Sequence, residues 1–208
     1  MREVLTIEAV QAGIQLGNAI WEQYCAEQGI DNAVKRKEIA GKDYFFEVFV
    51  EETGSGEFVP YDTASDLEQN VIDNVKNGPF ADISHPELLI HGKEDTANNF
   101  ARDHYTIGKQ TIDKVNDRLR KLVNNCDNVK GFFIGGGTGS GLGALILERL
   151  AVDYRKKTKI GFEIYHLPNL LTCVVEPYNA LLATHWLLDQ IEVSLLLDND
   201  AIYGICQM

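Results

Sequence analysis

The sequence predicts an α/β fold, in which a largely parallel sheet carries helices on both faces. Three observations lead to this prediction. Short apolar runs alternate with amphipathic helical patterns along the chain. The 208 residues, of which 45% are apolar, are enough to bury one sizeable core. A glycine-rich run also stands between an apolar strand and a helix.

The N-terminal half begins with a strand at 4–10 and a helix at 11–28 that has one apolar face. Residues 31–65 are rich in charge, glycine and aspartate, so we expect loops there and one short strand near 44–50. The elements expected next are a short helix at 71–75 and a short strand at 87–90.

The C-terminal half repeats strand and helix more clearly. The strongest helix is predicted at 105–123, where Ile112, Val115, Leu119 and Leu122 fall on one face. It is followed by a strand at 129–134, a helix at 141–154 and a strand at 160–165. The last elements are a helix opened by Pro177, a strand at 193–197 and a helix capped by residues 198–200 that ends at Met208.

Parallel sheets bind ligands beyond the carboxyl ends of their strands. The side chains expected at or near those ends are therefore the candidates for a site. They are Gln11, the segments 66–68 and 94–98, the glycine run, the segment 172–176 and Asn199.

The glycine run, Gly135 to Gly141, reads GGGTGSG. Glycines let backbone N–H groups converge, and the N-terminus of the following helix adds partial positive charge, so the run predicts a phosphate cradle. It is not a Walker loop, because no lysine occurs between Lys130 and Lys156, and the spacing G-x-G-x-x-G is not found. The alternative is a flexible hinge, which the flanking strand and helix disfavour.

Composition excludes several classes of protein. The net charge of −12 disfavours nonspecific nucleic-acid binding. No apolar run approaches the length that spans a membrane, and the N-terminus shows no secretory signal, so a cytosolic protein is expected. The cysteines have no C-x-x-C spacing and predict neither a zinc site nor a disulfide framework: Cys25, Cys126, Cys173 and Cys206.

Taken in order, these segments resemble the N-terminal nucleotide-binding domain of the tubulins. Besides GGGTGSG, the resemblance rests on QAGIQLGNAIWEQYCAEQGI, DLEQNVID, HPELLIHGKEDTANNFARDHYTIGK, ERLAVDYRKK, VVEPYNALLATH and DNDAIYGIC. The segments GKEDTANN, AVDYRKK and NDAIY are closer to alpha-tubulin than to beta- or gamma-tubulin. The resemblance covers nearly the whole chain, though residues 31–65 match only loosely.

The resemblance implies a Rossmann-like fold that binds GTP or GDP with Mg²⁺. It also implies a beta-tubulin-like partner subunit, assembly of heterodimers into microtubules, and a place in the cytoplasm and cytoskeleton. Neither a nucleic acid nor a membrane is implied as a partner.

The resemblance also assigns roles to residues on the phosphate side. Gln11 and Ala12 match the first phosphate loop, although a helix N-terminus packed by Gly13 and Gly17 is an alternative explanation. Asp66 and Glu68 match the acidic pair near the γ-phosphate, where Glu68 would serve magnesium through water; a solvated turn is the alternative. The γ-phosphate loop and the glycine cradle are matched by Asp95, Thr96, Ala97, Asn98, Gly136, Gly137, Thr138 and Gly139.

On the nucleoside side, Thr172 and Glu176 match the ribose contacts and Asn199 matches the asparagine that reads guanine. Each has a plainer alternative. Glu176 suits the N-terminus of a helix before Pro177, while Asn199 and Asn98 suit helix caps.

Three departures from the tubulin pattern lead to further expectations. The chain ends at Met208, so we expect one GTP-binding domain over 1–208, truncated before the core helix, with the intermediate and C-terminal domains absent. The glutamate that alpha-tubulin presents to its neighbour's nucleotide lies in that later part, so we assign no catalytic residue and leave GTP hydrolysis open. Val10 stands where the family has glycine, and we expect a β-branched residue there to crowd the backbone or to forbid a φ angle that the loop needs. The strand at 131–134 reaches the glycine run about four residues early.

Four functions remain open from the sequence. The leading one is an alpha-tubulin-like GTP-binding cytoskeletal subunit. The others are a self-contained GTPase, a fragment that sequesters a tubulin partner without polymerising, and a different nucleotide-binding α/β enzyme.

Overall fold

The computed structural model describes residues 2–36, 46–137, 140–165 and 174–207. Its centre is a six-stranded sheet, parallel throughout, with the order β5-β4-β1-β6-β7-β8. The strands are β1 (Glu3–Ala9), β4 (Asp62–Asp66), β5 (Leu89–His91), β6 (Val129–Gly137), β7 (Thr158–Tyr165) and β8 (Val193–Asp198). A separate antiparallel hairpin pairs β2 (Val50–Glu52) with β3 (Phe58–Pro60).

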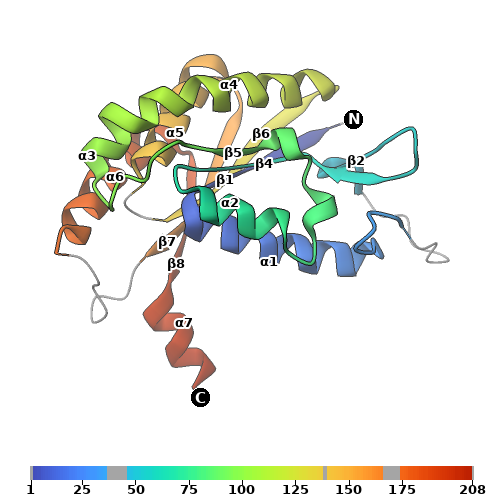
Figure 1. The fold of residues 1–208 in the computed structure, drawn as a ribbon, viewed down its shortest axis with the longest axis horizontal. Coiled ribbons are helices and arrows are strands. Elements are labelled where there is room, and N and C mark those ends of the chain that lie inside the picture. Colours follow the sequence, from blue (N-terminus) through green and yellow to red (C-terminus); the bar gives the residue numbers. More distant parts are fainter. Residues whose placement is uncertain (1, 37–45, 138–139, 166–173, 208) are drawn as a thin grey trace.

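Helices cover both faces of the sheet, so the predicted α/β fold is confirmed (Figure 1). One face carries α1 (Val10–Gln28) and α2 (Gln69–Lys76). On the other face, α3 (Phe100–Arg102) runs through a π-helical turn (Asp103–Ile107) into α4 (Gly108–Asn125), beside α5 (Gly141–Asp153) and α6 (Glu176–Gln190). The remaining helical elements are α7 (Asn199–Cys206) and short 3-10 turns at Phe46–Val48, Ala81–Ile83 and Pro86–Leu88.

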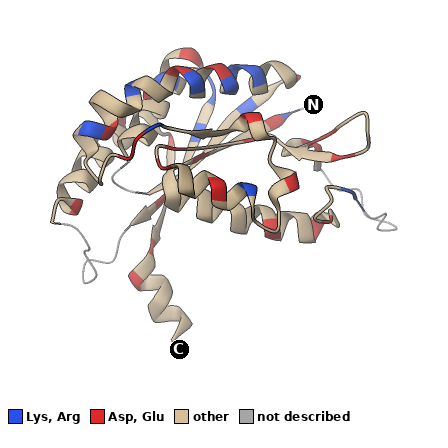
Figure 2. Cartoon of the chain, viewed as in Figure 1, with Lys and Arg blue, Asp and Glu red and all other residues tan. Residues whose placement is uncertain are grey.

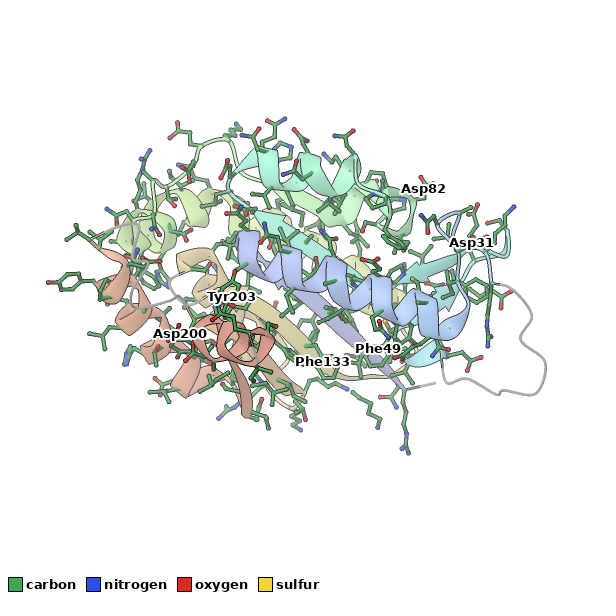
Figure 3. The ribbon with its side chains drawn as sticks, turned by 90° about the horizontal axis from the view of Figure 1, so that it is seen from below. Asp31, Phe49, Asp82, Phe133, Asp200 and Tyr203 are labelled. Carbon is green, nitrogen blue, oxygen red and sulfur yellow. The ribbon has the colours of Figure 1, made fainter. Side chains whose placement is uncertain are left out.

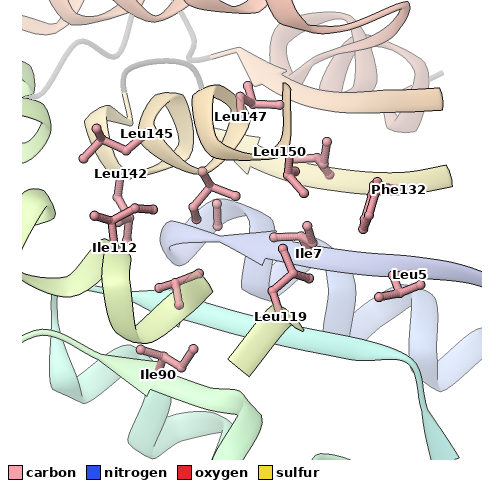
Figure 4. Close-up of a cluster of buried hydrophobic side chains, with 14 of the residues drawn as sticks. Leu5, Ile7, Ile90, Ile112, Leu119, Phe132, Leu142, Leu145, Leu147 and Leu150 are labelled. Carbon is pink, nitrogen blue, oxygen red and sulfur yellow. The ribbon is translucent and has the colours of Figure 1, made fainter. Parts of the chain in front are cut away.

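The main core lies between the sheet and helices α4 and α5 (Figure 4). Leu5 and Ile7 of β1 are fully buried there, because β1 is central and side chains from both faces of a central strand are enclosed. The apolar face predicted for α4 supplies Ile112, Val115 and Leu119. A second cluster on the α1 side includes Trp21, and Phe49 and Phe133 lie beside each other there with ring centroids 5.8 Å apart (Figure 3).

The prediction for residues 31–65 was wrong in one important respect. The segment ends in β4, a strand of the main sheet that pairs with β1. Its sequence, DTASD, gives no strand signal because Ala64 is its only apolar residue. All five residues are buried, and Thr63 compensates by donating its hydroxyl to the Leu88 carbonyl at 2.9 Å. The short strand expected near 44–50 falls partly on residues outside the described ranges, and only Val50 enters a strand, at the start of β2.

The glycine run is also arranged differently from the prediction. The expected strand 129–134 continues to Gly137, so Gly135, Gly136 and Gly137 belong to β6 rather than to a loop. Gly136 pairs with Ala9 of β1 on one side and with Glu163 of β7 on the other. The neighbouring strands run on beyond the last apolar residue of β6, and glycine backbone completes the hydrogen-bonded ladder that they require. The first three glycines of the run therefore form the carboxyl end of β6.

Candidate functional site

The strand order reverses between β1 and β6, which is where ligands bind in doubly wound sheets. Numbered along the chain, the six strands lie in the order third, second, first, fourth, fifth, sixth. The first turn of α1, with Gln11 and Ala12, therefore lies next to the end of β6. A side chain on Gly137 would come within 3.2 Å of the Ala12 Cβ, so this close approach depends on glycine.

The alternative explanation for this turn also holds. Gly13 and Gly17 let α1 pack closely on the sheet, because a Cβ on Gly13 would overlap the Gly135 carbonyl and one on Gly17 would overlap the Glu8 carboxylate. The two explanations are therefore compatible: the two glycines pack α1 on the sheet, and this packing places Gln11 and Ala12 at the reversal.

Val10 joins β1 to α1 with a φ angle of 56°. This is the left-handed region, which a β-branched residue adopts at a cost of about 1–3 kcal/mol. The expectation that a β-branched residue forbids the φ angle needed here is wrong, because Val10 adopts the positive φ and carries strain that glycine would not. The turn keeps its shape because β1 and α1 are both held by packing on either side of it.

The acidic pair lies where β4 ends. Asp66 is buried, and one of its carboxylate oxygens accepts the Glu68 backbone N–H at 2.9 Å, while Glu68 itself is half-buried. Burial is the main cause that raises the pKa of Asp66 to about 6; the nearby charges of Glu68 and Asp95 act in the same direction, and backbone hydrogen bonds oppose the shift. Asp66 is thus a carboxylate that a bound cation would stabilise strongly.

The segment 95–98 forms a strained turn beside this pair. Thr96 is buried and donates its backbone N–H to the Asp95 carboxylate at 2.6 Å. Ala97 and Asn98 follow with φ angles of 52° and 55°, two successive non-glycine residues in the left-handed region. The cap of α3 is Asn99, which accepts the Arg102 N–H at 3.2 Å, so the capping alternative for Asn98 is wrong.

A residue that the sequence analysis missed holds this turn in place. Asn179 of α6 is buried, donates to the Asn98 carbonyl at 2.7 Å and accepts the Phe100 N–H at 3.2 Å. It therefore ties two backbone groups of the strained turn to a helix 79 to 81 residues away. The sequence hint for this role is that Asn179 lies three residues after Glu176 on the same helix, and therefore on the same helix face.

The N-terminus of α5 holds a second missed residue. Ser140 caps the helix by accepting the Gly143 N–H at 2.8 Å, and Asp103 accepts the Gly141 N–H at 2.7 Å. Asp103 is buried, and burial raises its pKa to about 6. A carboxylate from the π-helical turn thus lies directly against the helix that follows the glycine run.

The nucleoside-side candidates are only partly described. Glu176 is buried in the first turn of α6, which agrees with its helix-terminal alternative. Asn199 is the first residue of α7, but the cap is Asp198, which accepts the Asp200 N–H at 2.8 Å. The amide of Asn199 is therefore not needed for capping. Thr138, Gly139 and Thr172 lie outside the described residues.

Lys and Arg on α4 lie among acidic residues (Figure 2), and some of them are paired with acids. Arg120 pairs with Asp153 at 2.7 Å and Lys121 with Asp117 at 3.8 Å. Within the described ranges, no three His, Cys, Asp or Glu side chains are grouped so that they could hold a metal ion by themselves, and no helix is long and apolar enough to cross a membrane.

A fully parallel sheet whose order reverses at a glycine-bearing strand, with a strained turn at Val10 beside the reversal, defines the chain as a Rossmann-like α/β domain. The model of the Tubulin/FtsZ family, GTPase domain, matches residues 3–207. Because the match covers nearly the whole chain, this protein belongs to the Tubulin/FtsZ family. The family's GTPase domain binds GTP or GDP, and the family is cytoskeletal, with polymerising or tubulin partners in general.

Proposed function

We propose that the chain is an alpha-tubulin-like subunit that binds guanine nucleotide with Mg²⁺ and pairs with a beta-tubulin-like partner in microtubules of the cytoplasm. The observation that carries the proposal is the convergence of the candidate residues. Val10 to Ala12, Asp66, the turn 95–98 and the end of β6 all follow or end strands at the carboxyl edge of one sheet, and the first and last of these flank the strand-order reversal. The alpha-tubulin-like segments GKEDTANN, AVDYRKK and NDAIY favour alpha over beta.

The residues present fit a phosphate-bearing ligand. Gly136 and Gly137 leave this edge without side chains, and the first turn of α1 presents backbone N–H groups beside them. The turn at Ala97 and Asn98 offers further backbone N–H groups, and Asn179 fixes its position. Gln11, exposed on α1, would orient the phosphates through its side-chain amide.

The residues also fit magnesium in the manner usual for nucleotide sites, where one or two carboxylates suffice because phosphates and water supply the other ligands. Asp66 and Glu68 would hold the ion, directly or through water. When bound, the ion would neutralise phosphate charge. The carboxylate of Asp66 stays oriented in either case, because it accepts the Glu68 N–H.

Nucleotide choice tests the proposal. Asn199 can both donate to and accept from a guanine edge, and Glu176 can accept from a ribose hydroxyl. We expect GTP and GDP to bind with magnesium more tightly than ATP in a calorimetric titration of the full chain. Asn199→Ala should bring the affinities for GTP and ATP together. Equal affinities of the unmodified chain for ATP and GTP would contradict guanine recognition.

Hydrolysis is a separate question. We propose that the isolated chain releases phosphate from GTP no faster than the uncatalysed background, because tubulin-type hydrolysis uses a glutamate from the adjoining subunit. A malachite-green assay over hours measures this. Sustained release that disappears in Asp66→Ala or Glu68→Ala would instead favour a self-contained GTPase.

A second candidate function is a fragment that binds or sequesters a tubulin partner without polymerising. The observation that favours it is the exposed apolar surface of β8 and α7, where Leu196 is 64% and Ile205 71% exposed. Co-sedimentation with assembling tubulin separates the two: a subunit enters the pellet in proportion to polymer, whereas a sequestering fragment reduces the polymer formed.

A further inference from the structure

The helix N-terminus next to the proposed phosphate site is already occupied by an anion of the chain itself. Asp103 accepts the Gly141 N–H at 2.7 Å, and the backbone of Leu142 also lowers the pKa of its carboxyl group. Its side chain is 6% exposed, and the second carboxylate oxygen has no hydrogen-bond partner within the described part of the chain. These are amides of the first turn of α5, which would otherwise add to an anion site.

The contact is built into the fold. A Cβ on Gly141 would approach the Asp103 Cβ to 2.8 Å, so glycine at the start of α5 is what lets the carboxylate come so close. The π-helical turn places Asp103 on the side that faces α5, between α3 and α4. The charges of Asp66 and Asp95, acids of the proposed site, are among the causes that raise the pKa of Asp103.

At neutral pH this carboxylate is an anion. Burial, aided by the charges of Asp66 and Asp95 and opposed by the backbone of Gly141 and Leu142, raises the pKa of Asp103 to about 6, below the pH of 7.5 used in the test. A negative charge at a helix N-terminus cancels much of the positive potential that the helix would offer to a phosphate. The cost to a ligand grows with the number of phosphate charges placed nearby.

We propose that Asp103 is an internal anion that weakens phosphate binding at the N-terminus of α5 and shifts the preference of the chain from nucleoside triphosphate toward diphosphate. This rests on the proposed guanine-nucleotide site. Asp103 is a specificity-determining residue in this arrangement, not a catalytic one. It acts through charge and through its occupation of the Gly141 amide.

The test is the Asp103→Asn variant, in which the side-chain oxygen still accepts from Gly141 while the charge is removed. The matched control is Asp113→Asn, which removes the same charge from an exposed position on α4. In calorimetric titrations at pH 7.5 with magnesium, we expect Asp103→Asn to bind GTP roughly tenfold more tightly, with a smaller gain for GDP. The control should stay within about twofold of the unmodified chain.

The outcomes separate this inference from the proposed function. If the unmodified chain binds GTP and Asp103→Asn binds it no more tightly than the control does, the role of Asp103 is overturned and the nucleotide site stands. If neither chain binds guanine nucleotide, the proposed function fails and the inference falls with it.

A second measurement uses the unmodified chain without nucleotide, so it does not depend on the stability of Asp103→Asn. The Gly141 amide of the ¹⁵N-labelled chain should shift with pH around 6 as Asp103 titrates beside it. An amide titration that shows Asp103 to be protonated at pH 7.5 overturns the inference directly, because the carboxyl group would then carry no charge.

Discussion

Single residues in this protein carry unusual backbone and charge states, and most of them lie at one edge of the sheet. Within the described ranges, the non-glycine residues with positive φ are Val10, Val34, Ala97 and Asn98, and three of the four belong to the candidate site. Backbone strain that is concentrated in this way is typical of ligand-binding turns. The strain at Val10 could be predicted from the sequence through the resemblance, whereas that at Ala97 could not, because alanine gives no signal for a left-handed conformation.

Replacing Val10 by glycine should stabilise the protein by about 1 kcal/mol, because glycine adopts the observed φ without a Cβ clash and this outweighs its greater freedom in the unfolded chain. The expected rise in melting temperature is about 2–4 °C for a chain of this size. Val152→Gly is the control, since Val152 is exposed within α5 and its replacement should lower stability. A melting temperature unchanged or lowered in Val10→Gly would show that the turn is not strained.

Buried carboxyl groups predict how stability changes with pH. Glu8 and Asp62 lie on the neighbouring strands β1 and β4; burial raises the pKa of Asp62 to about 7, and burial together with the charge of Asp62 raises that of Glu8. The native state therefore holds protons that the unfolded state releases near pH 4, and stability falls as pH rises toward and through 7.

We expect the protein to be more stable at pH 6 than at pH 8, and Asp62→Asn to remove about 1 kcal/mol of that difference. Urea unfolding at the two pH values measures the effect. Repulsion among the charges of a chain with net charge −12 also lowers stability as pH rises. This effect remains in Asp62→Asn, so the difference between the two proteins isolates the Asp62 carboxyl. An unchanged difference in Asp62→Asn would mean that the carboxyl titrates alike in both states.

At the level of elements, sequence patterning succeeded where a helix or strand has one apolar face and failed where the sheet imposes structure on unsuitable residues. The predicted helix at 105–123 is present, because Ile112, Val115 and Leu119 repeat at helical spacing. β4 was missed because its buried side chains are polar, and β6 was predicted three residues too short because glycine has low strand propensity. In both cases pairing with β1, a long-range contact, decided the structure.

The same limit applies to the site. The residues contributed by loops that follow strands could be named in advance, since strand ends share one edge of a parallel sheet. Asn179 and Asp103 could not, because each acts on a segment distant in sequence, across 81 and 38 residues. Hydrogen bonds between separate elements leave no periodic trace in a single sequence.

Removal of the Asn179 side chain should loosen the turn at 95–98. We expect Asn179→Ala to lower stability by about 1–3 kcal/mol, since it leaves the buried Phe100 N–H without its partner, and to weaken GTP binding further by releasing the strained backbone. Hydrogen exchange at the Phe100 amide should accelerate. Asn18→Ala, at an exposed position on α1, should change neither property. Protection of Phe100 that survives in Asn179→Ala would show that other contacts hold the turn.

On the scale of the whole molecule, one end of the sheet is left uncovered. β8 is an edge strand, and α7 stands apart from the helices that cover the sheet (Figure 1). Two leucines of β8 are partly exposed, Leu195 at 46% and Leu196 at 64%. The apolar face of α4 is covered, since Val115 and Leu119 are buried in the main core.

The uncovered end predicts self-association of the purified 208-residue chain. Ile202, Tyr203 and Ile205 of α7 extend the apolar surface of β8, and contiguous exposed patches of this kind are uncommon on monomers. An unpaired edge strand beside them offers backbone hydrogen bonds to a second chain. We therefore expect the average mass in sedimentation-velocity experiments to rise with concentration.

The double substitution Leu196→Lys with Ile205→Lys should return the chain to a monomer. Added lysines bring a net charge of −12 closer to zero, which by itself would favour association, so a gain in monomer can only come from loss of the apolar contact. The control is Val152→Lys, at a 70% exposed position on α5 away from β8 and α7. If the unmodified chain stays monomeric at high concentration, the uncovered end is not an association surface. If the control dissociates the chain as well as the double substitution does, then another face of the molecule carries the contact.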